Sequence, residues 1–166
     1  MVKTSKADGK TPSKSSGHYK RRNTPHFDEK KNPVVGRYRI FKRIGEGAFG
    51  RCFYAKSRHS GRKYCLKIIK AARKYVRAAK EEARVLTKIN EESPDGPFVQ
   101  FYRAFDFGEH YVMVFEPLGK NLYQLLRVNN FVGFPLSTVR VWAKKILKGL
   151  VELHKQGMIH TDLKVN

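Results

Sequence analysis

Three closely spaced glycines, Gly45, Gly47 and Gly50, stand between two segments that carry the pattern of β-strands. Residues 38–44 alternate aromatic or apolar with basic side chains, and residues 52–55 match the returning strand of a hairpin. A dinucleotide-binding turn needs its third glycine to open a helix, whereas a strand follows here. A glycine loop between strands suits a flap over nucleotide phosphates, because its N–H groups can approach phosphate oxygens without a Cβ clash. Taken alone, the loop also fits any glycine-rich hairpin.

The rest of the chain divides into a strand-rich first part and a helical second part. Together they predict an α+β fold: a five-stranded antiparallel sheet with one inserted helix, a linker, then a short and a long helix. Ser137 is the expected N-cap of the long helix and Gly157 its C-terminal stop. The expected strands are 38–44, 52–55, 62–69, 98–105 and 111–115, and the expected helices are 73–90, 121–127 and 138–156.

Composition narrows the classes of partner. The formal net charge of +21 indicates anionic partners, namely a phosphorylated ligand, an acidic surface or a nucleic acid. No RNA- or DNA-binding motif is recognised, so direct nucleic-acid binding is not expected. The two cysteines exclude a disulfide-rich scaffold and a four-cysteine metal site. Because no apolar run reaches transmembrane length and no signal-peptide core is found, we expect a soluble intracellular protein without a membrane partner.

The first 37 residues form a distinct segment. They are rich in Ser, Thr, Lys, Gly and Pro with few large apolar side chains, which predicts a disordered basic tail. Within it, residues 20–22 (Lys-Arg-Arg) form a short basic cluster. Such a cluster is either a nuclear-import patch or simply solvated charge.

Lys67 lies at the centre of the third expected strand, between Leu66 and Ile68. A lysine that points inward from an apolar strand needs an anionic partner, because an unpaired buried charge is costly. Glu82, on the helix that follows, shares a helix face with Leu86 and is the expected partner. Its neighbour Glu81 competes for this role, and both carboxylates could instead face solvent while Lys67 reaches out from the sheet edge.

A polar segment, residues 160–164 (His-Thr-Asp-Leu-Lys), follows the long helix. The Asp162 carboxylate is a candidate to accept a proton from a hydroxyl nucleophile, and Lys164 could neutralise charge on a phosphoryl group in transfer. The alternative is an ordinary polar loop.

The glycine loop, Lys67, Glu82 and residues 160–164 occur in an order that resembles the eukaryotic protein kinase family. Residues 160–164 look like those of its LAMMER group (CDC-like, dual-specificity kinases), as do residues 78–82 and 134–140. The resemblance implies a kinase N-lobe at 38–116, followed at 117–166 by the hinge and an incomplete C-lobe that contains the first helices and the catalytic loop. It covers the chain from about Tyr38 to Lys164.

The resemblance also implies roles for individual residues. Asp162 would be the catalytic base and Lys164 its phosphate-neutralising partner. Lys67 would hold the α- and β-phosphates of ATP and pair with Glu82. Phe115 would be the gatekeeper, with backbone groups of Glu116 and Leu118 binding adenine. The full set expected at the ATP site is Ile44, Gly45, Glu46, Gly47, Ala48, Phe49, Gly50, Cys52, Cys65, Lys67, Glu82, Phe115, Glu116 and Leu118.

Several positions depart from the family pattern. Cys52 stands where the family usually has Val, Cys65 where it usually has Ala, and Thr161 where Arg would bind a phosphorylated activation loop. Mg²⁺ is expected for the family, but its ligands are missing here and Asn166 is not assigned that role, so no metal-ligating residue is named. We therefore expect the C-terminal part to be truncated and the chain to transfer little or no phosphate.

The resemblance implies ATP as substrate, Ser/Arg-rich splicing-factor-like proteins as phosphoacceptors, and a nuclear location, with the cytoplasm as a second possibility. The alternative is a truncated, non-catalytic module that binds a nucleotide or a partner protein. A third hypothesis, a basic nucleic-acid-binding protein, rests on charge alone.

Overall fold

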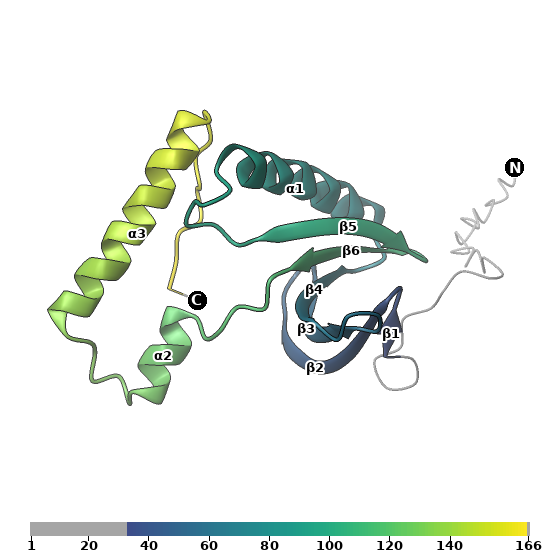
Figure 1. Cartoon of the computed structure of the whole chain (residues 1–166), viewed down its shortest axis with the longest axis horizontal. Coiled ribbons are helices and arrows are strands. Elements are labelled where there is room, and N and C mark those ends of the chain that lie inside the picture. Colours follow the sequence, from purple (N-terminus) through teal and green to yellow (C-terminus); the bar gives the residue numbers. More distant parts are fainter. Residues whose placement is uncertain (1–32, 166) are drawn as a thin grey trace, which may run out of the picture.

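The computed structural model describes residues 33–165. A strongly curled antiparallel sheet carries one long helix, and two further helices lie beyond the end of the last strand (Figure 1). The sheet has the order β1-β2-β3-β4-β6-β5. Its strands are β1 (Val34–Val35), β2 (Tyr38–Glu46), β3 (Gly50–Ser57), β4 (Lys63–Ile69), β5 (Phe101–Phe107) and β6 (His110–Phe115), and the helices are α1 (Arg73–Glu92), α2 (Leu122–Val128) and α3 (Leu136–Lys155).

All five expected strands form, and a sixth precedes them. In β1, Val34 pairs with Arg39 and Val35 with Tyr38 across a tight turn. A two-residue strand is too short to show an alternating pattern, so the sequence did not predict it. It falls at the end of the segment expected to be a disordered tail, which makes that part of the prediction wrong. Residues 1–32, including the basic cluster at 20–22, lie outside the described residues.

The two faces of the sheet build two apolar cores. On the inside of the curl, the core contains Val35, Tyr38, Ile40, Phe53, Ala55, Leu66, Ile68, Val112 and Val114. On the other face, α1 packs on a second core of Ile69, Ala79, Ala83, Phe101 and Met113. The small side chains of Ala79 and Ala83 let α1 lie close to the sheet, which fixes the direction in which its remaining side chains point.

The two C-terminal helices begin differently from one another. Asn121 caps α2 through a reciprocal arrangement with Gln124, in which each side chain accepts a hydrogen bond from the other residue's backbone N–H, at 2.8 and 3.1 Å. The expected Ser137 cap of α3 is wrong, because the helix begins at Leu136 with Pro135 at the N-cap position and no side-chain cap. The helix ends at Lys155, and Gly157 follows with φ +71°, the conformation expected of a stop signal.

The apolar stripe of α3 is only partly covered. Trp142 packs edge-on against Phe134, with ring centroids 4.9 Å apart. By contrast, Val139 and Ile146 keep 42% and 43% of their surface exposed. The helix contacts the rest of the chain near its end, where the Gln156 amide donates to Ser93 Oγ at 3.3 Å. None of the helices described between residues 33 and 165 combines the length and apolarity that a membrane span would require.

Candidate nucleotide-binding site

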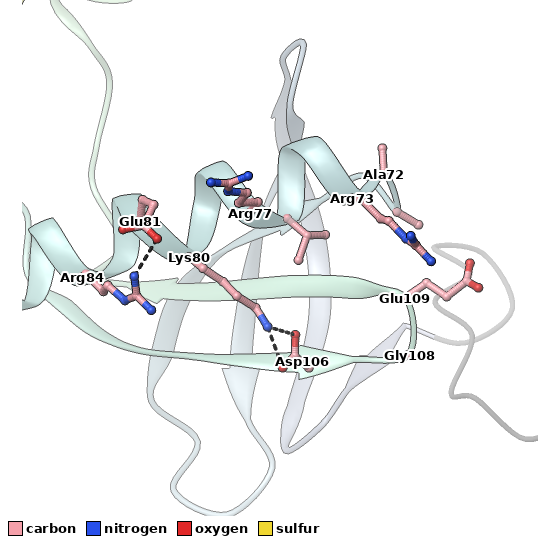
Figure 2. Close-up of a pocket in the computed structure, with 11 residues that line it drawn as sticks. Ala72, Arg73, Arg77, Lys80, Glu81, Arg84, Asp106, Gly108 and Glu109 are labelled. Atoms are coloured by element: carbon pink, nitrogen blue, oxygen red, sulfur yellow. Dashed lines mark hydrogen bonds and ion pairs between the residues drawn. The ribbon is translucent and has the colours of Figure 1, made fainter.

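The central contact of the site joins the sheet to α1. Lys67 of β4 reaches Glu82 of α1, and its Nζ lies 2.7 Å from both carboxylate oxygens. The two side chains are 25% and 43% exposed, so the pair is open to solvent on one side. Of the two carboxylates that competed for this role, Glu81 points outward and pairs with Arg84 at 2.6 Å (Figure 2). The structure thus brings together the lysine and one of the two glutamates that the sequence singled out.

The glycine loop folds as the tip of the β2–β3 hairpin, where Gly47 N–H donates to Gly50 C=O at 2.9 Å. Its three glycines serve different purposes. A Cβ on Gly50 would lie 2.5 Å from the Ile68 carbonyl oxygen, so the close approach of β4 requires glycine there. A Cβ on Gly45 or Gly47 would meet no atom of the described residues within 4 Å. Neither packing nor a positive φ requires glycine at those two positions, which leaves their backbone open to an approaching ligand.

Lys70, which the sequence did not single out, holds the loop in place. Its backbone N–H donates to Phe49 C=O at 3.0 Å, and its Nζ lies 3.2 Å from Gly47 C=O. The same Nζ lies 3.6 Å from Glu46, whose carboxylate also pairs with Arg43. The exposed Phe49 ring packs edge-on against Tyr75 of α1, 5.4 Å between centroids. Ala48 lies between Gly47 and Phe49, in the loop that joins β2 to β3. Contacts of this kind depend on tertiary folding and leave no short-range pattern.

Two thiols lie on the same sheet face as Lys67. Cys52 of β3 is the direct cross-strand partner of Lys67, and Cys65 lies two residues before Lys67 on β4, opposite Phe115. Hydrogen bonding with Cys65 lowers the pKa of Cys52 to about 7, and the positive charge of Lys67 acts in the same direction. The same hydrogen bond raises the pKa of the Cys65 thiol. The sheet therefore presents a polarised thiol pair beside the lysine.

The segment after β6 supplies backbone groups. Glu116 is held by Gln100 in both directions: its N–H donates to Gln100 C=O at 3.0 Å, and its carboxylate accepts from Gln100 N–H at 2.8 Å. Tyr54 Oη donates to Leu118 C=O at 2.6 Å. Within the described part of the chain, the Glu116 carbonyl and the Leu118 N–H make no hydrogen bond. One acceptor and one donor therefore remain available two residues apart.

The segment after α3, which holds the predicted catalytic residues, runs back toward α2 (Figure 1). Asp162 is well exposed, at 72%, and its Oδ2 pairs with Lys164 Nζ at 2.9 Å. The preceding Thr161 has φ +59°, an unusual conformation for a β-branched residue. The Val165 carbonyl accepts from Tyr123 N–H at 2.9 Å, which ties the segment to α2. The Asp162 carboxylate thus stands open to solvent beside a lysine.

A magnesium ion is the group that the sequence resemblance implies besides ATP. In the stretch from residue 33 to residue 165, no three His, Cys, Asp or Glu side chains gather where they could hold a metal ion. Asp162, a carboxylate of the candidate catalytic segment, is already paired with Lys164. The residues that the structure describes therefore do not form a magnesium site by themselves.

Comparison with known proteins identifies a family and several relatives of this chain. Residues 38–166 match the model of the protein kinase domain. The chain is 40% identical to the serine/threonine-protein kinase SRPK of Physarum polycephalum over 135 residues, 76% of this chain and 32% of that protein. It is also 40% identical to the dual specificity protein kinase CLK2 of Homo sapiens over 131 residues, 77% of this chain and 26% of that protein.

A solved kinase-domain structure has a similar fold. A crystal structure of the kinase domain of PF14_0431 superposes with a TM-score of 0.75 at 32% identity, covering 84% of this chain and 41% of that one. The chain spans 26–33% of the length of the curated CLK, SRPK and AFC relatives that it matches. Together, the fold, the Lys67–Glu82 pair and these matches place the chain in the protein kinase domain family, among relatives of the SRPK, CLK and AFC kinases.

Proposed function

We propose that the chain is the ATP-binding part of a protein serine/threonine or dual-specificity kinase. The observation that carries the proposal is the Lys67–Glu82 ion pair, which holds a cationic head on the sheet face beside the glycine loop. In this role the Lys67 Nζ binds the α- and β-phosphates, and Glu82 keeps the lysine oriented toward them. Gly45 and Gly47 leave the loop backbone free to approach the phosphates.

The adenine ring would bind between Ile44, Cys52 and Cys65 on one side and the segment after β6 on the other. We call this segment, which carries Glu116 and Leu118, the hinge. Adenine presents a donor, the N6 amino group, next to the N1 acceptor. The free Glu116 carbonyl and Leu118 N–H complement this pair. Phe115, at the end of β6 opposite Cys65, would limit the depth of the pocket as its gatekeeper.

In the reaction, Asp162 would orient the acceptor hydroxyl and take its proton, while Lys164 neutralises charge on the phosphoryl group in transfer. Bound Mg²⁺ would supply charge neutralisation at the phosphates. By the resemblance stated above, the phosphoacceptors are Ser/Arg-rich splicing-factor-like proteins and the protein acts in the nucleus, with the cytoplasm as a second location.

A specific observation favours a second candidate, a non-catalytic nucleotide- or partner-binding module. Positioning and metal charge supply most of the catalysis in phosphoryl transfer. Because the described residues hold no cluster of metal ligands, this chain on its own is expected to bind ATP and transfer little phosphate. Robust Mg²⁺-dependent phosphorylation of a Ser/Arg-rich peptide, lost in Asp162→Asn, would reject the second candidate.

Titration of the full chain with a fluorescent ATP analogue tests the primary proposal. Lys67→Met and Glu82→Gln each remove half of a charge-assisted contact, so we expect each to weaken binding roughly tenfold or more. Glu81→Gln is the matched control: it neutralises the adjacent carboxylate, which pairs with Arg84 on the outer side, and it should leave affinity unchanged. Equal affinities for wild type and Lys67→Met would overturn the proposal.

A further inference from the structure

A second concave surface lies beside the segment that follows β6 and shares Ile44 with the candidate nucleotide site. It has a volume of about 640 Å³ and is formed by β2 and β3 on one wall and by the hinge and α2 on the other. We call it the hinge groove. Its charged and apolar lining includes Lys42, Arg43, Ile44, Lys120, Arg127 and Val128.

The charge of the hinge groove is one-sided. Of the residues that the structure describes, four cationic side chains line it and no carboxylate does. Arg43 pairs with Glu46, which lies outside the groove. Lys42, Lys120 and Arg127 make no ion pair within the described part of the chain. Cations gathered on one concave surface raise the local concentration of anions. A bound anion would also relieve the repulsion among these cations.

A larger groove, between α1 and the β5–β6 turn, makes the contrast plain. It also carries four cations, but three carboxylates stand among them (Figure 2). Lys80 pairs there with Asp106 at 3.2 Å and Arg84 with Glu81 at 2.6 Å. Two of the four cations of that groove pair with carboxylates that line it, whereas no carboxylate of the described residues lines the hinge groove.

The walls of the hinge groove are fixed. Tyr54 lies directly opposite Lys42 across the β2–β3 ladder, and its ring stacks on Phe41 with centroids 6.2 Å apart. Its hydroxyl donates to the Leu118 carbonyl at 2.6 Å, which ties the strand wall to the hinge wall. The spacing between the cations on the two walls is therefore set by the fold.

The size and lining of the groove indicate its ligand. Its volume lies within the ~300–1,000 Å³ of small-ligand pockets, which suits a short peptide segment better than a long phosphate backbone. Val128, 63% exposed, adds apolar surface that the candidate nucleotide site does not use. We propose that the hinge groove binds a short acidic peptide segment of a partner protein, with carboxylate or phosphate groups flanking an aliphatic residue. A basic Arg-Ser stretch is excluded by its charge.

Fluorescence anisotropy with a labelled Glu-Glu-Leu-Glu-Glu-Leu peptide tests this with the full chain, and the same peptide with Gln in place of Glu is the neutral probe. The double variant Lys120→Glu/Arg127→Glu reverses two cations of the groove. The control Arg58→Glu/Lys63→Glu makes the same change in net charge at the exposed β3–β4 turn, outside the groove. All four positions are exposed, so thermal melting should show that both variants fold like the wild type.

We expect the acidic peptide to bind at least tenfold more tightly than the neutral one, and the groove variant to lose at least tenfold in affinity. The control variant should lose less than threefold, and saturating ATP should leave a measurable peptide affinity. Equal losses in the two double variants would overturn the proposal, since attraction would then follow net charge alone. Tighter, groove-dependent binding of a single-stranded oligouridine would also overturn it, in favour of an RNA ligand.

Discussion

Replacing a loop glycine by alanine should have different effects at Gly50 and at Gly47. At Gly50 it should lower stability, and at Gly47 it should weaken nucleotide binding. At Gly50, the new methyl group would lie 2.5 Å from the Ile68 carbonyl oxygen and 3.2 Å from the Ile68 carbonyl carbon and Ile69 Cα. These are backbone atoms of a central strand, so no side-chain rotation can relieve the clash. At Gly47, the methyl group would meet no atom of residues 33–165 within 4 Å.

The size of the effect follows from the geometry. Overpacking of a well-packed region costs about 1–3 kcal/mol, and a contact with strand backbone belongs at the upper end of that range. For a unit of this size, ~2–3 kcal/mol lowers the melting temperature by roughly 10 °C or more. Gly47→Ala should change stability by at most ~1 kcal/mol, because its φ suits alanine.

Thermal and urea unfolding, followed by circular dichroism, give the stability of both variants, and fluorescent-ATP titration gives their affinity. Gly50→Ala should melt well below the wild type. Gly47→Ala should keep its stability and bind the nucleotide roughly tenfold more weakly, because its Cβ obstructs the approach of phosphate to the backbone. A Gly50→Ala protein as stable as the wild type would refute the reasoning about the loop.

Two further predictions concern thiol chemistry and the distribution of stability. Alkylation of Cys52 by iodoacetamide, followed by mass spectrometry, should rise through a midpoint near pH 7, because the thiolate is the reactive form. Cys65→Ala should shift that midpoint upward, and a midpoint already near 9 in the wild type would contradict the described contact. In limited proteolysis, residues 38–116 should be protected longer than residues 120–166, because nearly all buried apolar side chains lie in the first range; equal protection would refute this division.

Much of the site was predictable from the sequence because its parts lie on regular elements. The alternation around Lys67 placed it on a strand, and the shared helix face with Leu86 favoured Glu82 over Glu81. What decides between the two glutamates is the packing of Ala79 and Ala83 on the sheet, which turns Glu82 toward β4 and Glu81 toward solvent. That packing is a tertiary contact, so the sequence alone left the choice open.

Other features were missed for identifiable reasons. The β1 strand has only two residues and exists because a turn returns it to β2. Ser137 looked like a helix cap, but Pro135 sets the start of α3 one residue before it. Lys70 follows β4 with no distinguishing pattern, and its contact with the Gly47 carbonyl arises only when the hairpin folds over. The roles proposed for the hinge residues and for Asp162 remain predictions.

Titration calorimetry of the full chain with ATP and with GTP tests the central claim most directly. Guanine presents an acceptor where adenine presents the N6 donor, so it would set its O6 against the Glu116 carbonyl. We predict that ATP binds, that GTP binds at least tenfold more weakly, and that Lys67→Met loses the ATP signal. The absence of ATP binding by the folded wild-type chain, or an ATP affinity that Lys67→Met leaves unchanged, would contradict the account.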